Sequence, residues 1–213
     1  MSRAAIAAGR DPAAVTLVAV TKAQSAEIIR AAATAGVTDF GESYLQEALA
    51  KIDQLTDLPL NWHFIGGIQS NKTRLLAERF NWVHSVDRLS IARRLSEQRP
   101  FHAPALNLCL QVELVPEPNK GGVGPEALNE LAAAVSLLPR VRLRGLMCVP
   151  PPQPDVAAAR AMFARLRALL EKQNARGLEL DTLSMGMSAD FESAIAEGAT
   201  LVRIGTALFG SRT

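Results

Sequence analysis

Residues 16–36 read TLVAVTKAQSAEIIRAAATAG, a short apolar run that reaches Lys22 and is followed by a stretch of helical periodicity ending in a glycine. The apolar run predicts a buried strand over 16–21, and the periodicity predicts a helix over 25–35 that ends at Gly36. The strand is apolar throughout rather than alternating, which is typical of strands that are covered on both faces in a parallel sheet. This β–α unit sets the pattern for the rest of the chain.

Seven more units of the same kind follow. Their predicted strands are 39–42, 62–66, 82–86, 105–114, 143–149, 182–185 and 201–204. Their predicted helices are 44–52, one from about 71, one from about 88, 125–138, 155–174, a short one after 188, and a terminal segment over 205–210. Because strands that alternate with helices pair in parallel, eight units favour the α/β class and a single (β/α)8 TIM-type barrel, one domain over residues 1–213. An open doubly wound sheet is the alternative, but VAVTKAQS at 18–25 lacks the glycine-rich first loop usual in that fold.

Composition narrows the classes of partner. The chain has 213 residues, 48% of them hydrophobic and 21% charged, which is typical of a globular protein. Its 23 basic and 21 acidic residues are interspersed, so we expect no nucleic-acid partner and no anionic membrane surface. No apolar run approaches the roughly 18 residues of a membrane-spanning helix, and residues 1–12 lack the apolar core of a signal peptide. We therefore expect a cytoplasmic protein.

Cysteine and histidine give no sign of a metal site. Cys109 and Cys148 each lie inside an apolar run, where a buried thiol is the ordinary outcome. His63, His84 and His102 have no accompanying cysteine or carboxylate pattern of the kind that binds zinc or non-haem iron. We predict no metal.

Lys22 is the strongest candidate for chemistry. A TIM-type barrel carries its active site at the carboxyl ends of the strands, and Lys22 ends the first apolar run. Apolar neighbours around the side-chain stem disfavour the ammonium form and leave a nucleophilic amine, which can form a Schiff base with a carbonyl substrate or with pyridoxal phosphate (PLP). The alternative is a surface lysine whose stem lies on apolar groups while its amine stays in water.

The last two units offer an anion site. The segments 184–188 and 203–206 bring hydroxyls, glycines and backbone amides after the seventh and eighth strands, where barrels commonly bind phosphate. The alternative is simple helix capping, with Ser188 as the N-cap and Asp190 in the first turn. Arg203 would lie beside these loops, where it could hydrogen-bond a cofactor ring nitrogen or pair with a carboxylate such as Glu42.

Several sequence blocks resemble a known family. They are VAVTK at 18–22, DFGESYLQE at 39–47, WHFIGGIQSNK at 62–72, LSMGMSADFESAI at 183–195 and GATLVRIGTALFG at 198–210. In this order they resemble the pyridoxal phosphate homeostasis proteins, also called the proline synthase co-transcribed homologue family. The resemblance implies a barrel of PLP fold type III, related to the N-terminal domain of alanine racemase.

The resemblance also assigns roles to residues. It implies that Lys22 forms the Schiff base and that Arg203 lies near the pyridine nitrogen. The phosphate ligands would be Ser188, Gly205 and Thr206, with Met187 before them, and the segments that hold His63, Ile65 and Ser184 would line the cofactor. Two features depart from the family: Ser43 stands where asparagine is usual, and Ala23, Gln24 and Ser25 follow the lysine.

Three functions fit these residues. The family resemblance implies a monomeric, non-catalytic carrier or reservoir that holds PLP, passes it to apoenzymes and affects amino-acid metabolism. A PLP-dependent amino-acid racemase is the alternative, but racemisation needs two positioned proton-transfer groups, and the one tyrosine available as a second base is Tyr44. A phosphosugar lyase or aldolase could also use Lys22, on the substrate rather than on a cofactor.

Overall fold

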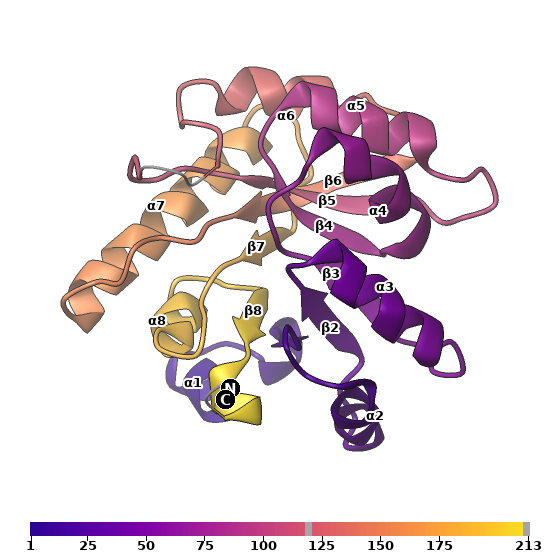
Figure 1. Cartoon of the computed structure of the whole chain (residues 1–213). Helices are drawn as coiled ribbons and strands as arrows, with labels where there is room; N and C mark the ends of the chain where they lie inside the picture. The colour runs from indigo at the N-terminus through magenta and orange to yellow at the C-terminus, as the bar shows by residue number, and fades with distance from the viewer. Residues whose placement is uncertain (118–120, 211–213) are drawn as a thin grey trace.

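The computed structural model describes residues 1–117 and 121–210, and its eight parallel strands form a closed barrel (Figure 1). In chain order around the barrel they are β1 Thr16–Val20, β2 Asp39–Glu42, β3 Asn61–Phe64, β4 Trp82–Val86, β5 Leu106–Gln111, β6 Val141–Met147, β7 Thr182–Ser184 and β8 Leu201–Ile204. β1 pairs with β8 to close the barrel, with Thr16 opposite Leu201 and Ala19 opposite Ile204. The predicted TIM-type barrel is confirmed, and the open-sheet alternative is wrong.

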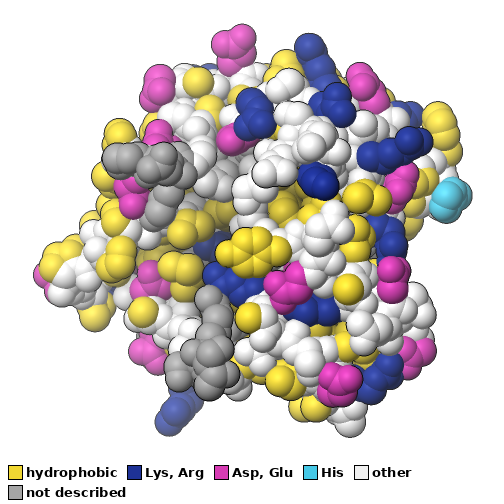
Figure 2. Space-filling model, viewed as in Figure 1, with side chains coloured by type: hydrophobic (Ala, Val, Ile, Leu, Met, Phe, Trp, Pro, Cys, Tyr) yellow, Lys and Arg dark blue, Asp and Glu magenta, His cyan; other side chains and the backbone are white. Residues whose placement is uncertain are grey.

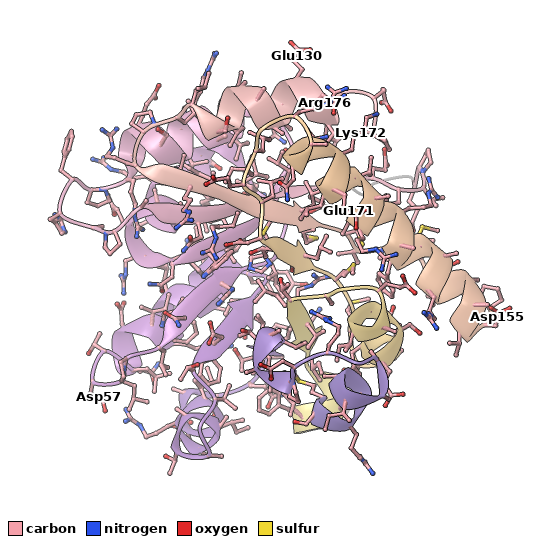
Figure 3. The ribbon with its side chains drawn as sticks, turned by 180° about the vertical axis from the view of Figure 1, so that it is seen from behind. Asp57, Glu130, Asp155, Glu171, Lys172 and Arg176 are labelled. Atoms are coloured by element: carbon pink, nitrogen blue, oxygen red, sulfur yellow. The ribbon has the colours of Figure 1, made fainter. Side chains whose placement is uncertain are left out.

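Helices connect the strands and cover the outside of the barrel (Figure 1). They are α1 Ser2–Ala7, α2 Ala26–Thr34, α3 Leu45–Gln54, α4 Thr73–Arg79, α5 Leu89–Gln98, α6 Leu128–Ser136, α7 Val156–Asn174, α8 Phe191–Ala196 and α9 Thr206–Phe209, with 3-10 turns at Pro12–Ala14 and Ser70–Lys72. Charged side chains such as Asp57, Glu130 and Asp155 lie at the periphery (Figure 3). The apolar faces of the helices pack against the strands and form one continuous core with them.

The ends of two helices follow from local chemistry. Asp155 caps α7, because its carboxylate accepts a hydrogen bond from the Ala158 N–H at 2.8 Å. Gly36 follows α2 with a φ of +95°, a left-handed conformation that suits glycine and ends the helix. Both helices therefore match their predicted ranges to within one residue.

The predicted strand boundaries agree best with the structure where a polar residue or a glycine ends the apolar run. β2, β4 and β8 have their predicted ranges. β5 ends earlier than predicted because the chain after Gln111 pairs with its own loop: Val112 forms a bridge with Val123, and the Glu113 N–H donates to the Val123 carbonyl at 3.0 Å. β6 begins earlier, at Val141, because that residue pairs with Leu106 of β5. Pairing with distant residues therefore sets where β5 ends and where β6 begins, and the local sequence does not reveal that pairing.

The surface shows no dominance of one charge. On the face drawn in Figure 2, basic and acidic side chains are interspersed among hydrophobic and uncharged groups. Within residues 1–117 and 121–210, no helix combines the length and the apolar character needed to cross a membrane.

Candidate functional site

A cavity of about 340 Å³ opens at the carboxyl ends of the first and last strands. We call it the mouth cavity. It is lined by Val20, Lys22, Ser43, Ile65, Val149, Met187, Ser188, Ala189, Arg203, Gly205 and Thr206. Seven predicted site residues thus lie around one space: Lys22, Ile65, Met187, Ser188, Arg203, Gly205 and Thr206. The barrel brings them together although they are distant in the sequence, as the carboxyl-end rule predicts.

Lys22 lies two residues after the end of β1 at Val20, and it is half-buried. Val20 of the same strand and Ile65, which follows β3, give apolar walls to the space that Lys22 faces. The sequence-based expectation of a lysine at a strand end with apolar neighbours is met in this geometry. A lysine so placed can present its amine to a ligand inside the cavity.

The backbone on both sides of Lys22 is held by a buried charged cluster, which we call the Lys51 cluster and which comprises Thr21, Glu42, Glu47 and Lys51. The Lys51 ammonium donates to the Thr21 carbonyl at 2.6 Å, to Glu42 Oε1 at 2.7 Å and to Glu47 Oε1 at 2.6 Å. Glu47 also accepts the N–H of Ala23, at 2.5 Å. The residues before and after Lys22 are therefore both tied to α3, which limits where the lysine can point.

The Lys51 cluster is not among the sites that the sequence predicts. Lys51 is 5% exposed, whereas a lysine four residues after a glutamate on a helix ordinarily forms a solvated pair. The available signal was the spacing: Glu47 and Lys51 share a helix face, and that helix follows the strand that ends at Glu42. Burial raises the pKa of Glu42, and the hydrogen bonds from Lys51 and Thr21 act against this rise.

The loop between β7 and α8 is shaped by Asp190. Its carboxylate accepts the Met187 N–H at 2.6 Å, and α8 begins at the next residue, Phe191. Ser188 is therefore not the N-cap of this helix, which corrects the capping alternative. Its hydroxyl oxygen instead accepts the N–H of Ala207 at 3.2 Å, which joins the two loops that carry the predicted phosphate ligands.

Gly205 lets the ends of β8 and β1 approach closely. A Cβ at this position would lie 3.2 Å from the Val20 carbonyl oxygen and 3.4 Å from the Val20 Cβ. A side chain there would press on the strand that carries Lys22 and fill part of the cavity wall. A glycine followed by Thr206 leaves backbone and hydroxyl groups exposed to the cavity, a combination suited to a phosphate.

Arg203 is 4% exposed and forms two buried hydrogen bonds. Its Nη1 donates to Ser184 Oγ at 2.7 Å, and its Nη2 donates to the Cys148 carbonyl at 2.8 Å. The alternative pairing with Glu42 is wrong, because Lys51 and Thr21 hold that carboxylate. Burial lowers the pKa of Arg203 from its ordinary value, but an arginine remains charged at neutral pH.

His63 and Ser184 do not line the mouth cavity. Both are completely buried inside the barrel, where His63 hydrogen-bonds Asp39 and His84. Neither residue is therefore placed to contact a ligand in this cavity directly. Ser184 instead hydrogen-bonds Arg203, which does line the cavity. The two cysteines are buried and free, as predicted, and burial raises the pKa of both thiols to about 12.

The alanine racemase N-terminal domain family matches residues 4–213 of this chain. The pyridoxal phosphate homeostasis protein of Pseudomonas aeruginosa is 64% identical over 209 residues, which are 98% of this chain and 90% of that protein. The chain belongs to the pyridoxal phosphate homeostasis protein family. The Escherichia coli K12 member of this family is 47% identical over 215 residues, covering 100% of this chain and 92% of its own.

A solved structure of a relative agrees with the fold of the family. PipY of Synechococcus elongatus, solved with PLP bound, superimposes with a TM-score of 0.88 at 42% identity. The comparison covers 98% of this chain and 99% of PipY. The family and the barrel that the sequence blocks implied are thus both confirmed.

Proposed function

We propose that this chain binds PLP in the mouth cavity through a Schiff base with Lys22 and serves the homeostasis of this cofactor in the cytoplasm. One observation carries the proposal: an amine, a guanidinium and two hydroxyl-bearing loops line a single cavity in a chain of this family. The PLP-bound structure of PipY supports it. The role is that of a monomeric, non-catalytic carrier or reservoir that hands PLP to apoenzymes and so affects amino-acid metabolism.

The residues present fit the chemical parts of PLP. When bound, PLP supplies an aldehyde that condenses with an amine, an aromatic ring nitrogen and a phosphate dianion. Lys22 provides the amine from β1. Ser188, Gly205 and Thr206 offer hydroxyl and backbone donors to the phosphate from the loops after β7 and β8, and Gly205 leaves the room that a side chain would occupy. Ile65 and Met187 provide apolar contact for a flat ring.

Arg203 is suited to the ring nitrogen. It lines the cavity, and its two hydrogen bonds to Ser184 and Cys148 use only some of its N–H groups. A guanidinium beside a ring nitrogen opposes protonation of that nitrogen, which weakens the ring as an electron sink. Racemases tolerate an arginine at this nitrogen, so this contact alone does not separate a carrier from a racemase.

The position of Tyr44 favours a carrier. Racemisation needs a second proton-transfer group on the face of the substrate opposite Lys22. Tyr44 does not line the mouth cavity; it is 64% exposed and lines a neighbouring cavity. A racemase built on this chain would therefore need a second base from elsewhere.

The test is Lys22→Ala, measured by visible absorption after incubation with PLP. We expect wild-type protein to show the band of an imine and the variant to lose it. Borohydride reduction followed by peptide mapping should place the label on Lys22. Lys72→Ala is the matched control, because Lys72 lines the neighbouring cavity and not this one. A wild-type protein that takes up no PLP contradicts the proposal. That result would favour a lyase or aldolase that uses Lys22 on its substrate.

Catalysis is tested separately. The holoprotein is incubated with L-alanine and other amino acids, and the products are resolved by chiral chromatography. We expect no conversion above that of free PLP. Turnover of about 1 per second or faster, a rate ordinary for enzymes, would contradict the non-catalytic role.

A further inference from the structure

We propose that a one-directional chain of hydrogen bonds through the barrel interior joins Arg203 to Asp39, and that Asp39 is thereby a positioning residue for the mouth cavity. We call this chain the interior relay; its members are Arg203, Ser184, His84, His63 and Asp39. Its existence does not depend on the proposed function, but its consequence for PLP does.

The interior relay consists of four consecutive hydrogen bonds. Arg203 Nη1 lies 2.7 Å from Ser184 Oγ, and Ser184 Oγ lies 2.7 Å from His84 Nδ1. His84 Nε2 lies 2.9 Å from His63 Nδ1, and His63 Nε2 lies 2.9 Å from Asp39 Oδ1. Ser184, His84 and His63 are 0% exposed, so solvent cannot replace any of these inner contacts.

The direction of the relay follows from its two ends. A guanidinium only donates hydrogen bonds, and an ionised carboxylate only accepts them. Burial lowers the pKa of His63 despite its contact with Asp39, and burial, with His63 and Arg203 nearby, holds the pKa of His84 well below its usual range. Two neutral imidazoles can satisfy this chain when both carry their proton on Nε2. Each group then donates toward Asp39, from Arg203 through to the carboxylate.

The relay spans the barrel from one end to the other. Arg203 is next to the last residue of β8 and lines the mouth cavity. Asp39 is the first residue of β2, and its side chain remains 13% exposed. Because the strands are parallel, the first residue of β2 belongs to the end of the barrel opposite the mouth cavity. A carboxylate at that end is thus in contact, through neutral groups, with a cation in the candidate site.

The relay connects the buried positive charge of Arg203 to a carboxylate that can compensate it. Among the residues that the structure describes, no carboxylate lies within ion-pair distance of Arg203. The charge of Asp190 acts on Arg203 without an ion-pair contact. A buried cation that touches no carboxylate is costly, and aligned hydrogen-bond dipoles that end on a second carboxylate, Asp39, reduce that cost. Burial acts to raise the pKa of Asp39, but the hydrogen bonds from His63 and Thr38 outweigh it and lower that pKa, so the terminal acceptor stays ionised at neutral pH.

The imidazoles are also fixed by packing. His63 stacks on Trp82 with ring centroids 5.5 Å apart and an interplanar angle of 7°. On Trp82, the Arg144 guanidinium lies 4.9 Å from the ring centroid, and Arg144 in turn pairs with Asp181. Since the His63 ring cannot turn freely, the loss of the Asp39 charge should be felt at Arg203 rather than absorbed by a ring flip.

The first test uses the apoprotein and needs no cofactor. Ring-nitrogen NMR of ¹⁵N-histidine-labelled protein should show His63 and His84 neutral at pH 7.5, each protonated on Nε2. An imidazolium at His63, or an Nδ1–H form of either ring, overturns the relay. This spectrum of the wild-type protein tests the direction even if a variant fails to fold.

The second test is a double-variant cycle on PLP affinity, measured by equilibrium dialysis. Asp39→Asn keeps the size of the side chain and removes its charge, and Ser184→Ala removes the link between His84 and Arg203. We expect Asp39→Asn to weaken PLP binding about tenfold in the wild-type background and to have almost no effect in the Ser184→Ala background. Equal effects in both backgrounds overturn the proposal, since a merely structural role of Asp39 would be additive.

Asp57→Asn is the matched control, because Asp57 precedes β3 and pairs with Arg30 outside the relay. It should leave both imidazole tautomers and the PLP affinity unchanged. An effect equal to that of Asp39→Asn would mean that any charge at this end of the barrel acts on the site, and would overturn the relay. Failure of the wild-type protein to bind PLP, with both tautomers as expected, would contradict the proposed function and leave the relay standing.

Discussion

Two buried cations support the mouth cavity, Arg203 as part of its wall and Lys51 through the backbone before Lys22, and the protein compensates them in different ways. Lys51 touches two carboxylates directly, Glu42 at 2.7 Å and Glu47 at 2.6 Å. Arg203 touches none and reaches Asp39 only through Ser184, His84 and His63. The Lys51 ammonium donates its hydrogen bonds to Thr21, Glu42 and Glu47, and it thereby holds the backbone around Lys22. The indirect arrangement leaves donor groups of Arg203 for a ligand.

The difference separates a structural cation from a functional one. A lysine whose ammonium contacts two carboxylates and a carbonyl has no remaining capacity for a substrate. An arginine balanced at a distance keeps its charge available at the cavity wall. We make four predictions, from the largest expected effect to the smallest: the first tests this distinction directly, and the others test the phosphate loops, the relay histidines and the turn after Lys22.

Lys51→Ala should lower the free energy of unfolding by about 3–5 kcal/mol, because it leaves the fully buried carboxylate of Glu42 without its cationic partner. Chemical denaturation followed by circular dichroism measures the loss. The double variant Lys51→Met with Glu42→Gln removes both charges and should recover most of the stability. Arg203→Met is the comparison at the second cation. It should cost less, about 1–3 kcal/mol, because it leaves no contacting carboxylate without its partner. Equal losses for the two cations would contradict the distinction.

Ser188→Ala and Thr206→Ala should each weaken PLP retention by about 1–3 kcal/mol, because each removes a hydroxyl donor to a charged phosphate. Equilibrium dialysis measures the change. Thr34→Ala is the control, since its hydroxyl bonds the Arg30 carbonyl on α2, away from the cavity. Unchanged affinity in both cavity variants would rule out these loops as the phosphate site.

Acid should destabilise the protein through the relay histidines. The folded pKa values of His63 and His84 are lowered, so their contribution to stability is complete above the unfolded pKa of about 6.5 and is lost as the pH falls below it. The slope is about 1.4 kcal/mol per pH unit for each imidazole kept neutral. Denaturation at pH values from 7.5 to 5.5 measures it; the raised pKa of Glu42 acts in the opposite direction.

A variant isolates the histidine contribution to that pH dependence. His84→Gln should reduce the slope, because the unfolded state then binds one proton fewer. His102→Gln is the control, since His102 is exposed and outside the relay. A slope that is the same in all three proteins would show that the buried imidazoles do not cause the acid sensitivity.

Ala23→Gly should raise the free energy of unfolding slightly, by about 0.5 kcal/mol. Ala23 has a φ of +62°, a conformation that costs an alanine about 1–2 kcal/mol and that glycine adopts without this strain. The greater freedom of glycine in the unfolded chain offsets part of the stability gained by relieving the strain. Thermal or chemical unfolding measures the difference. Gly36→Ala is the mirror control at a φ of +95° with open space around it, and should destabilise the protein. A loss of stability in Ala23→Gly would mean that the turn after Lys22 is not strained.

The sequence predicted the elements of this fold well because each strand is a short apolar run bounded by a polar residue or a glycine. It located Lys22 and the loops at 184–188 and 203–206 for the same reason, since strand ends define the mouth of a barrel. It also predicted Arg203 at the cavity, although its alternative partner Glu42 proved wrong.

The sequence could not predict the two charge networks. Lys51 and Asp39 are ordinary residues in their own segments, and their roles arise only when the barrel places α3 against β1 and the interior of β2 against β3. His63 and Ser184 were assigned to the cofactor because they lie in family blocks. The structure places both inside the barrel, where residues distant in the sequence meet and spacing carries no information.

The pairing of β1 with β8 has a consequence for biosynthesis. Lys22 follows the opening strand and Arg203 lies in the final one, so the candidate site lies where the two ends of the sheet join. A nascent polypeptide has its lysine early but cannot assemble the opposite wall until translation has delivered the last strand. Ligand binding would then require that both ends of the chain have been made and that the barrel has closed.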